Sequence, residues 1–460
     1  MVYSITPNVN LAKPFFGLAK LCLAEYDIYM SATPEQTIAA AGFPVYLHGL
    51  SAIDSYLGRN GAASVQILCG ADLADLARLF EGLRYPGAAF ADAAVDSGGK
   101  TWYFRCEDAL SKDDMQDPYR FLWKISGHSL NFLEFYQDCT SRRFYDPHDI
   151  YPLLRSIRDN VNYDETDASQ WWKSANVNAD SCHALFDAAV VLARYFSPSS
   201  PEDEFSLEGA SSIEDKSSIK GASGSRDINA IAAQFGGLHK ATPPVIEEQR
   251  LLLINLLEAA NPAPGFELLK KCGFIAAYWP ELAILDDVDH SKEFHPEGNA
   301  WKHTLETFRY RKPGANGVFD LCLSLGLLLH DMGKPIAASF GSHRFDGHAE
   351  LGARAAARFL ERLEFNPSLV QGVYFLVKNH MLPAALKRLP VARTGEIMAS
   401  PLFPLLMELY RCDESSSFKG LDGYYENSAA YQSYLRNVKN PYRSADGKKT
   451  NRNAILLGKK

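Results

Sequence analysis

The segment that most constrains the fold is a nearly continuous apolar run, residues 323–329, which ends at the dipeptide His330-Asp331. An apolar run of this length packs into a protein core. Gly333 is an expected helix stop and Pro335 lies just beyond it, so the run predicts a buried helix that ends at the dipeptide. Imidazole and carboxylate groups together bind divalent first-row metal ions. We therefore expect a polar site at the end of a core helix, facing a cavity.

Length, charge and cysteine usage limit the class of protein. A chain of 460 residues is too long for one hydrophobic core, which predicts about two to four domains. The net charge of −8 excludes a protein that coats nucleic acid indiscriminately. The eight cysteines form no CxxC pair, which suits a reducing compartment and excludes a thiolate zinc site. No segment is long and apolar enough to cross a membrane, so we expect a cytoplasmic protein without a membrane partner.

The periodicity of apolar residues predicts an α+β chain. Short apolar strands alternate with helices between residues 36 and 136, which indicates a small α/β head. The expected strands cover residues 43–50, 63–69, 102–108 and 130–136. From about residue 150 onwards the apolar spacing is helical, which predicts a mostly helical neck and body followed by an all-helical domain.

Two segments differ in composition from the rest of the chain. Residues 197–240 are rich in serine, glycine and charge, which predicts a flexible linker because such a segment buries too little apolar surface to fold alone. Residues 436–460 carry eight basic side chains against a single acidic one. Most tails of this kind are simply solvated, but this charge also suits contacts with phosphate groups.

Four residues from separate segments are candidate metal ligands. His303 and Asp413 are expected on two amphipathic helices, and His330 and Asp331 end the apolar run. Neighbours on a helix point about 100° apart, so His330 and Asp331 serve one ion only if their side chains splay at the helix end. Helices of a bundle commonly contribute ligands to a shared ion. Taken singly, each residue also fits an ordinary structural role.

Three further residues lie on the same helical scaffold. His348 is expected to open a helix with Asp346 as its N-cap, and His380 is expected to close another. Either histidine suits a second ion or a substrate phosphate. Lys334, four residues after His330, is placed to pair with a phosphate as a point charge.

The order of these motifs resembles a known superfamily. HPEGNAWKHT, LLLHDMGKP, RFDGHAELGA and LYRCDESSS, with GFIAAYWPEL upstream, are similar to the HD domain of many bacterial CCA tRNA nucleotidyltransferases and poly(A) polymerases. By this resemblance His303, His330, Asp331 and Asp413 would be the metal ligands, and His348 and His380 the second-site histidines. The HD superfamily implies metal-dependent hydrolysis of phosphoesters such as cyclic phosphates and nucleotides.

The front half resembles the polymerase-beta-like head of the same family more weakly. The retained positions are Gly49, Asp54, Leu57, Gly58, Arg59 and Asn131. The altered positions are Leu50, Ile53, Ser64 and Gln66, where the family has a second glycine, an arginine and a metal-binding DxD. Two-metal phosphoryl transfer needs carboxylates that Ser64 and Gln66 do not supply. A side chain at Leu50 is also expected to block the backbone amides that meet triphosphate. The resemblance therefore implies a degenerate transferase site.

The sequence predicts six regions. They are a degenerate nucleotidyltransferase-like head (1–145), a helical neck (146–196), a flexible linker (197–240), a helical RNA-binding-like body (241–290), an HD phosphohydrolase domain (291–425) and a basic tail (426–460).

The main functional prediction is a metal-dependent phosphohydrolase acting on nucleotides, cyclic phosphates or RNA ends. Asp331 and Lys334 would be its catalytic residues, and its cofactor a divalent ion (Mn, Fe, Co, Ni, Zn or Mg). Its partners would be a nucleotide or phosphoester and, in addition, tRNA or another RNA. Two alternatives stay open, namely an RNA- or tRNA-binding protein with vestigial sites and a tRNA nucleotidyltransferase (polynucleotide adenylyltransferase). The sequence leaves the oligomeric state open.

Overall fold

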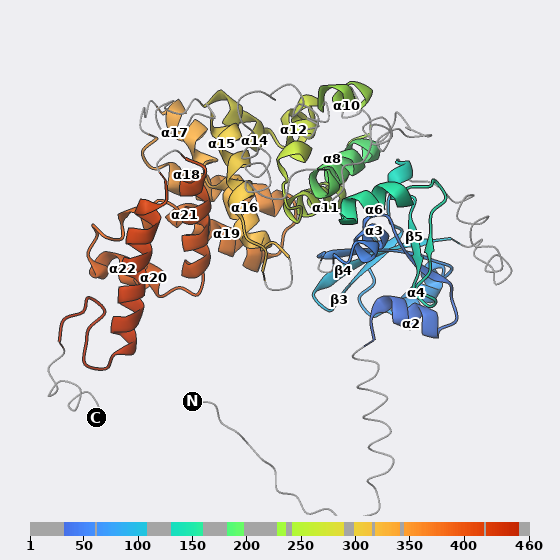
Figure 1. Ribbon diagram of the computed structural model, residues 1–460, viewed down its shortest axis with the longest axis horizontal. Helices are drawn as coiled ribbons and strands as arrows, with labels where there is room; N and C mark the ends of the chain where they lie inside the picture. Colours follow the sequence, from blue (N-terminus) through green and yellow to red (C-terminus); the bar gives the residue numbers. More distant parts are fainter. Residues whose placement is uncertain are drawn as a thin grey trace, which may run out of the picture.

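The protein folds into a small α/β head and a larger helical part, which confirms the predicted α+β class (Figure 1). This computed structural model describes residues 32–59, 62–107, 130–159, 182–196, 228–235, 242–288, 299–314, 318–340, 345–417 and 420–449. No helix in these ranges is long and apolar enough to span a membrane.

The head is built on one mixed six-stranded sheet. Its strands are β1 (Val45–His48), β2 (Ser64–Cys69), β3 (Ala93–Ser97), β4 (Lys100–Cys106), β5 (Tyr136–Asp138) and β6 (Phe144–Tyr145), in the spatial order β3-β4-β2-β1-β5-β6. β2 and β4 are parallel, and the other neighbours are antiparallel. Side chains alternate between the two faces of a strand, so Val65 and Ile67 of β2 point to one face while Ser64 and Gln66 point to the other.

Helices cover both faces of this sheet. Helices α2 (Pro34–Ala40) and α4 (Leu73–Leu79) pack Ile38 and Leu76 against Val65, Ile67 and Phe104. Helix α3 (Leu50–Tyr56) lies on the opposite face, where its buried side chains join the core of the helical part. Ser64 and Gln66 therefore lie between the sheet and the helical part of the protein.

Two parts of the head differ from the sequence prediction. Residues 130–136 were expected to form one strand, but 131–133 form a 3₁₀ turn and the strand β5 begins only at Tyr136. The reason is that Leu130, Phe132 and Phe135 are buried in the helical core, so their apolar run does not signal a strand face. The prediction also missed β3, which pairs with β4 around Gly98-Gly99, both at positive φ; this dipeptide is a recognisable hairpin signal.

The helical part contains most of the helices of the protein. They are α6 (Tyr151–Asp159), α8 (His183–Tyr195), α10 (Ile228–Phe235), α11 (Ile246–Leu257), α12 (Ala263–Lys271), α13 (Phe274–Tyr278), α14 (Pro280–Ala283), α15 (Ala300–Thr307), α16 (Leu321–Leu329), α17 (Gly333–Ser339), α18 (His348–Arg362), α19 (Pro367–Asn379), α20 (Val391–Met398), α21 (Phe403–Ser415) and α22 (Asp422–Lys439). Helix α10 lies inside the segment expected to be a linker, because Ile231 and Phe235 anchor it in the core. The rest of 197–240 lies outside the described residues.

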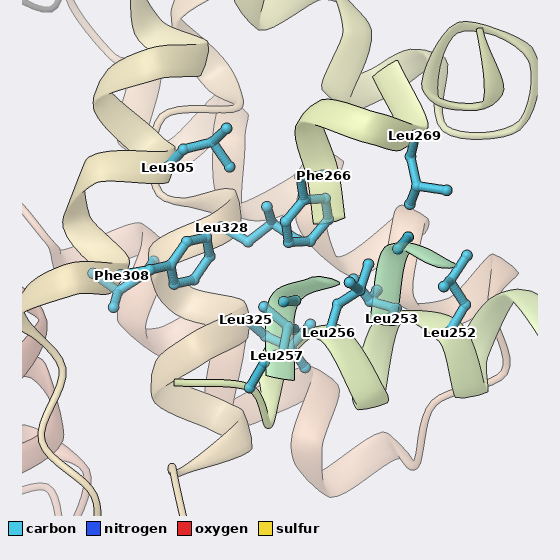
Figure 2. Packing of buried hydrophobic residues seen from close by; sticks show 14 of the residues in the cluster. Leu252, Leu253, Leu256, Leu257, Phe266, Leu269, Leu305, Phe308, Leu325 and Leu328 are labelled. Atoms are coloured by element: carbon cyan, nitrogen blue, oxygen red, sulfur yellow. The ribbon is translucent and has the colours of Figure 1, made fainter. Parts of the chain in front are cut away.

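The apolar run forms α16, which lies at the centre of this core. Leu325 and Leu328 contact a cluster built from α11, α12 and α15, including Leu256, Phe266 and Leu305 (Figure 2). Helices α19 and α21 pack on α16 as well, and a Cβ on Gly326 would lie 2.9 Å from Leu376 and 3.1 Å from Leu409. Burial of α16 on every side fixes where its last residues lie.

A buried arginine ties α11 to α16. The Arg311 guanidinium donates hydrogen bonds to the carbonyl oxygens of Leu257 and Ala259 (both 2.7 Å) and to Ser324 Oγ (2.6 Å). These carbonyls lie at the C-terminal end of α11, where no N–H group of the helix itself is left to bond them. Arg311 therefore caps α11 from inside the core.

We expect Arg311→Met to lower the free energy of unfolding by about 3 kcal/mol or more, because it leaves several buried carbonyls without a donor. Urea unfolding followed by circular dichroism measures this effect. The matched control is Arg309→Met, which removes a partly exposed ion pair with Glu306 (3.5 Å) and should cost under about 1 kcal/mol. Equal costs for the two variants would contradict the capping role.

Candidate metal centre

The last residues of the core helix form the middle of a buried polar cluster. α16 ends at Leu329, so His330 is its C-cap and Asp331 follows immediately, with side chains only 1% and 2% exposed. His330 Nε2 lies 3.3 Å from Asp331 Oδ2, which shows that the two side chains converge despite being sequence neighbours. Lys334 Nζ forms an ion pair with the same Asp331 oxygen at 2.6 Å.

The first side of this cluster comes from α15 and α21. His303 on α15 places Nε2 3.0 Å from Asp413 Oδ1 on α21, and that oxygen lies 4.0 Å from His330 Nε2. Ser416 Oγ donates to the Asp413 carbonyl (2.7 Å) and lies 3.4 Å from His303 Nδ1. The structure thus brings together all four predicted ligands, with Asp413, a quarter exposed, at the rim.

The second side comes from α18 and α19. His348 opens α18 and His380 caps the end of α19, and their Nε2 atoms lie 3.0 Å apart. His348 Nε2 is 3.8 Å from Asp331 Oδ1, so Asp331 lies between the two sides. The expected N-cap Asp346 is wrong: Gly347, with φ +76°, holds that position.

A glycine allows α17 to lie against α18. Gly333 was expected only to stop a helix, but it is the first residue of α17. A Cβ on Gly333 would overlap the His348 carbonyl and the Gly352 amide, so no larger residue fits without separating the helices. Gly333 therefore helps to hold Lys334 and His348 on opposite flanks of Asp331.

The hydrogen bonds of three histidines show which ring nitrogen each of them turns toward the centre. Nδ1 of His330, His348 and His380 each lies 2.7–2.9 Å from a backbone carbonyl three residues earlier. A carbonyl only accepts, so each Nδ1 carries a proton, and each ring in its neutral form turns a bare Nε2 lone pair toward the centre. Two such lone pairs 3.0 Å apart, on His348 and His380, repel each other unless a proton or a cation lies at the site.

The carboxylates of the centre are held in their charged form. Burial opposes ionisation of Asp331, but His330 and Lys334 outweigh it and hold the pKa of the Asp331 carboxyl well below its usual range. The pKa of Asp413 is lowered as well: partial burial opposes the shift, and the hydrogen bond and charge of His303 outweigh it. Anionic oxygens and imidazole lone pairs in one place are the donors that a divalent ion requires.

Two groups of three side chains can each hold an ion. They are His303, His330 and Asp331, and Asp331, His348 and His380, with the ligand atoms of each group within 4.8 Å of one another. Asp331 is common to both groups. The residues therefore fit one ion or two ions bridged by Asp331, and Lys334 beside them supplies a positive charge for a phosphate oxygen.

The four head positions singled out from the sequence have different surroundings. Gly49 follows β1 as the N-cap of α3, with φ +57°, and a Cβ there would lie 2.7 Å from Gln66 Oε1. Asp54 accepts hydrogen bonds from Arg194 (2.6 Å) and Tyr195 (2.7 Å), so it joins α3 to α8.

Ser64, 8% exposed, lies with its Oγ 3.4 Å from Asn255 Oδ1 on α11, while Gln66 is half-buried beside Gly49. Leu50 was expected to obstruct the turn after Gly49, but its side chain is buried in the core.

Sequence reasoning missed the polar joint between the head and α11. Glu247 accepts from Tyr103 Oη (2.6 Å) and Arg84 (2.9 Å), and Glu248 accepts from the Ala89 amide (2.9 Å). A signal was present, because carboxylates inside the apolar periodicity of α11 are rarely buried without a partner. Nothing local in the sequence identified the head as that partner.

Curated relatives of the chain are tRNA nucleotidyltransferases and CCA proteins. The CC-adding tRNA nucleotidyltransferase of Thermus thermophilus is 34% identical over 190 residues, 39% of this chain and 42% of that protein. The Multifunctional CCA protein of Alkalilimnicola ehrlichii is 32% identical over 153 residues, 33% of this chain and 34% of its own length. The matched part is thus less than half of either relative. No model of a known protein family matches the chain.

Solved structures of similar layout include the Bacillus stearothermophilus CCA-adding enzyme in complex with CTP, at 15% identity and a TM-score of 0.40, covering 87% of this chain and 81% of that one. The Thermotoga maritima CCA-adding enzyme complexed with tRNA has 12% identity and a TM-score of 0.34, and the match covers 95% of this chain and 88% of that one. At these TM-scores the likenesses carry no argument about this chain.

These relatives overturn the main functional prediction. A phosphohydrolase was expected, but the sequence relatives are a CC-adding tRNA nucleotidyltransferase and multifunctional CCA proteins, so that prediction is wrong and the nucleotidyltransferase alternative is favoured. An HD domain and hydrolase activity receive no support from the relatives. The broader predictions of an enzyme and of a divalent-metal cofactor agree with the class of these relatives. The chain is related in sequence to the tRNA nucleotidyltransferases, as its motifs suggested.

Proposed function

We propose that this protein adds nucleotides to the 3′ end of tRNA. The observation that carries the proposal is the 34% identity over 190 residues to a CC-adding tRNA nucleotidyltransferase. The head supports it with the turn after β1, where the left-handed Gly49 brings the start of α3 against Gln66 of β2. The partners would be tRNA together with CTP or ATP.

A second candidate is tRNA binding without nucleotide transfer. The observation that favours it is the content of β2, Ser64–Cys69, which holds no carboxylate, whereas two-metal transfer needs carboxylates to bridge the ions. Ser64 also lies against Asn255 of α11 rather than toward an open cleft. Incorporation of CMP or AMP into tRNA that lacks its 3′ end decides between the two functions.

We expect Gly49→Ala to lower nucleotide incorporation tenfold or more, because the added Cβ meets Gln66 Oε1 at the turn that would face the nucleotide. Incorporation of labelled CMP into tRNA lacking its 3′ end measures the loss. Gly82→Ala, outside the retained family positions, is the matched control: it also places an alanine at positive φ (+77°), with no atom within 4 Å of the new Cβ.

The two glycine variants separate the outcomes. Equal activity in both would show that the Gly49 turn takes no part in nucleotide binding. A wild-type protein that binds tRNA but incorporates no nucleotide would replace the first candidate with the second.

We further propose that the buried centre in the helical part holds a divalent ion. The ligands would be His303, His330, Asp331 and Asp413, and His348 with His380 would hold a second ion or a phosphate. The support is the convergence of the Nε2 lone pairs on an anionic Asp331. When bound, the ion supplies positive charge beside Lys334, which would orient a phosphate oxygen. We retain the predicted regions 1–145, 146–196, 197–240, 241–290, 291–425 and 426–460 as a proposed division.

Asp331→Asn should remove most of the bound metal, since Asp331 belongs to both ligand groups. The protein is incubated with Mn²⁺, desalted and analysed by inductively coupled plasma mass spectrometry. Asp286→Asn, which alters a surface carboxylate paired with Lys270 (2.7 Å), is the control and should keep the wild-type metal content. Unchanged metal in the Asp331 variant would exclude this site.

Acid should destabilise the metal-free protein through His380. Burial, with a further contribution from His330, lowers the pKa of His380 to about 4, below an ordinary value near 6.5. The unfolded chain therefore binds more protons, so stability is lost as pH falls from about 6.5 to about 4. We expect a loss of about 2 kcal/mol between pH 7 and pH 5. Urea unfolding in EDTA at each pH measures this loss, and the variant His380→Gln should lose less stability than the wild type. An identical dependence of the unfolding free energy on pH in the two proteins would contradict this account.

A further inference from the structure

The chain that follows α22 folds into an ordered basic loop. Residues 443 and 449 form an antiparallel bridge, and the Ser444 amide donates to the Lys448 carbonyl (2.9 Å). Asn437 Nδ2 donates to the Ala445 carbonyl (3.4 Å), which fastens the loop onto the last turns of α22. We call residues 436–449, the last turn of α22 together with the loop that follows it, the basic loop. These contacts fix the course of the backbone through the loop.

The basic loop carries a local excess of positive charge. Its exposed basic residues are Arg436, Lys439, Arg443, Lys448 and Lys449. Asp446 is the acidic residue of the loop, and its carboxylate is already paired with Lys448 (3.1 Å). The chain as a whole has a net charge of −8, so this concentration runs against the overall charge. A local basic surface on an acidic protein attracts polyanions there and not elsewhere.

An exposed aromatic ring lies among these charges. The Tyr442 side chain is 56% exposed, and the Tyr442 amide donates to Asn440 Oδ1 (3.0 Å), which sets the direction of the chain at the ring. Arg443 follows directly and donates to the Gly447 carbonyl (3.2 Å). Exposed aromatic rings beside basic side chains bind unpaired bases by stacking while the charges hold the phosphates.

We propose that the basic loop binds single-stranded RNA, with its basic side chains on the phosphates and one base stacked on Tyr442. The loop lies at the end of the helical part remote from the head (Figure 1), so it is separate from the proposed nucleotide and metal sites. The combination of exposed charge and an exposed ring favours RNA over an acidic protein segment, which has no planar bases to stack. This site shares with the proposed function only the assumption that RNA is the partner.

The test is fluorescence anisotropy of a labelled single-stranded oligoribonucleotide with the full chain, without nucleotides, at several salt concentrations. The variant is Arg436→Gln/Lys439→Gln/Lys449→Gln, which leaves the backbone contacts of the loop and the Lys448–Asp446 pair in place. Removing about three phosphate contacts should weaken binding tenfold or more and reduce the slope of log K against log salt by about 2.

The matched control removes three exposed charges outside the loop and outside the RNA-binding-like body, as Lys312→Gln/Arg354→Gln/Arg358→Gln, and should bind as the wild type does. Tyr442→Ala should weaken binding about fivefold or more through lost stacking, whereas Tyr442→Phe should restore it. Equal weakening in both triple variants, or no effect in either, would overturn the proposal. The measurement does not involve nucleotide addition, so loss of the proposed transferase function leaves its outcome unaffected.

Discussion

The arrangement of the two halves depends on the carboxylates buried along α11. Glu247, Glu248 and Glu258 accept hydrogen bonds from head residues, and Glu258 takes the Ala63 amide at 2.6 Å. A buried carboxylate is costly unless its oxygens find donors, so each of these contacts is satisfied only when head and helical part are docked. Arg194, which pairs with both Asp54 and Glu258, links α3, α8 and α11 into the same joint. The head is thereby held in one orientation by polar contacts that tolerate little displacement.

The same helix α11 leads through the core to the candidate metal centre. Arg311 caps its end and bonds to α16, and α16 is surrounded by apolar contacts up to His330. A helix with so little freedom places His330 and Asp331 accurately, and the carbonyls of its last turn fix the tautomer of the histidine. The rigid packing of α16 thus also preorganises the candidate ligands. A side chain that is already held in place loses little conformational entropy when it binds an ion.

The sequence predicted those features that local patterns carry. The apolar run predicted α16, and the order of His303, His330, Asp331 and Asp413 predicted side chains that the fold brings within a few ångströms. The sequence prediction was wrong where the local structure depends on distant contacts. Leu130 and Phe135 resemble strand residues but are buried among helices. Ile231 and Phe235 anchor α10 in the core, although the segment around them is mostly polar. The joint on α11 was missed for the same reason, since the partners of Glu247 lie more than a hundred residues away.

The joint also bears on the chemistry of the head. Ser64 occupies the edge of β2 that packs on α11, and its contact with Asn255 is made possible by a small neutral side chain. An aspartate at this position would add a further carboxylate close to Glu258, whose pKa is already raised by burial and by the charge of Asp54. The close docking of head and α11 and the absence of a carboxylate at Ser64 are therefore mutually consistent.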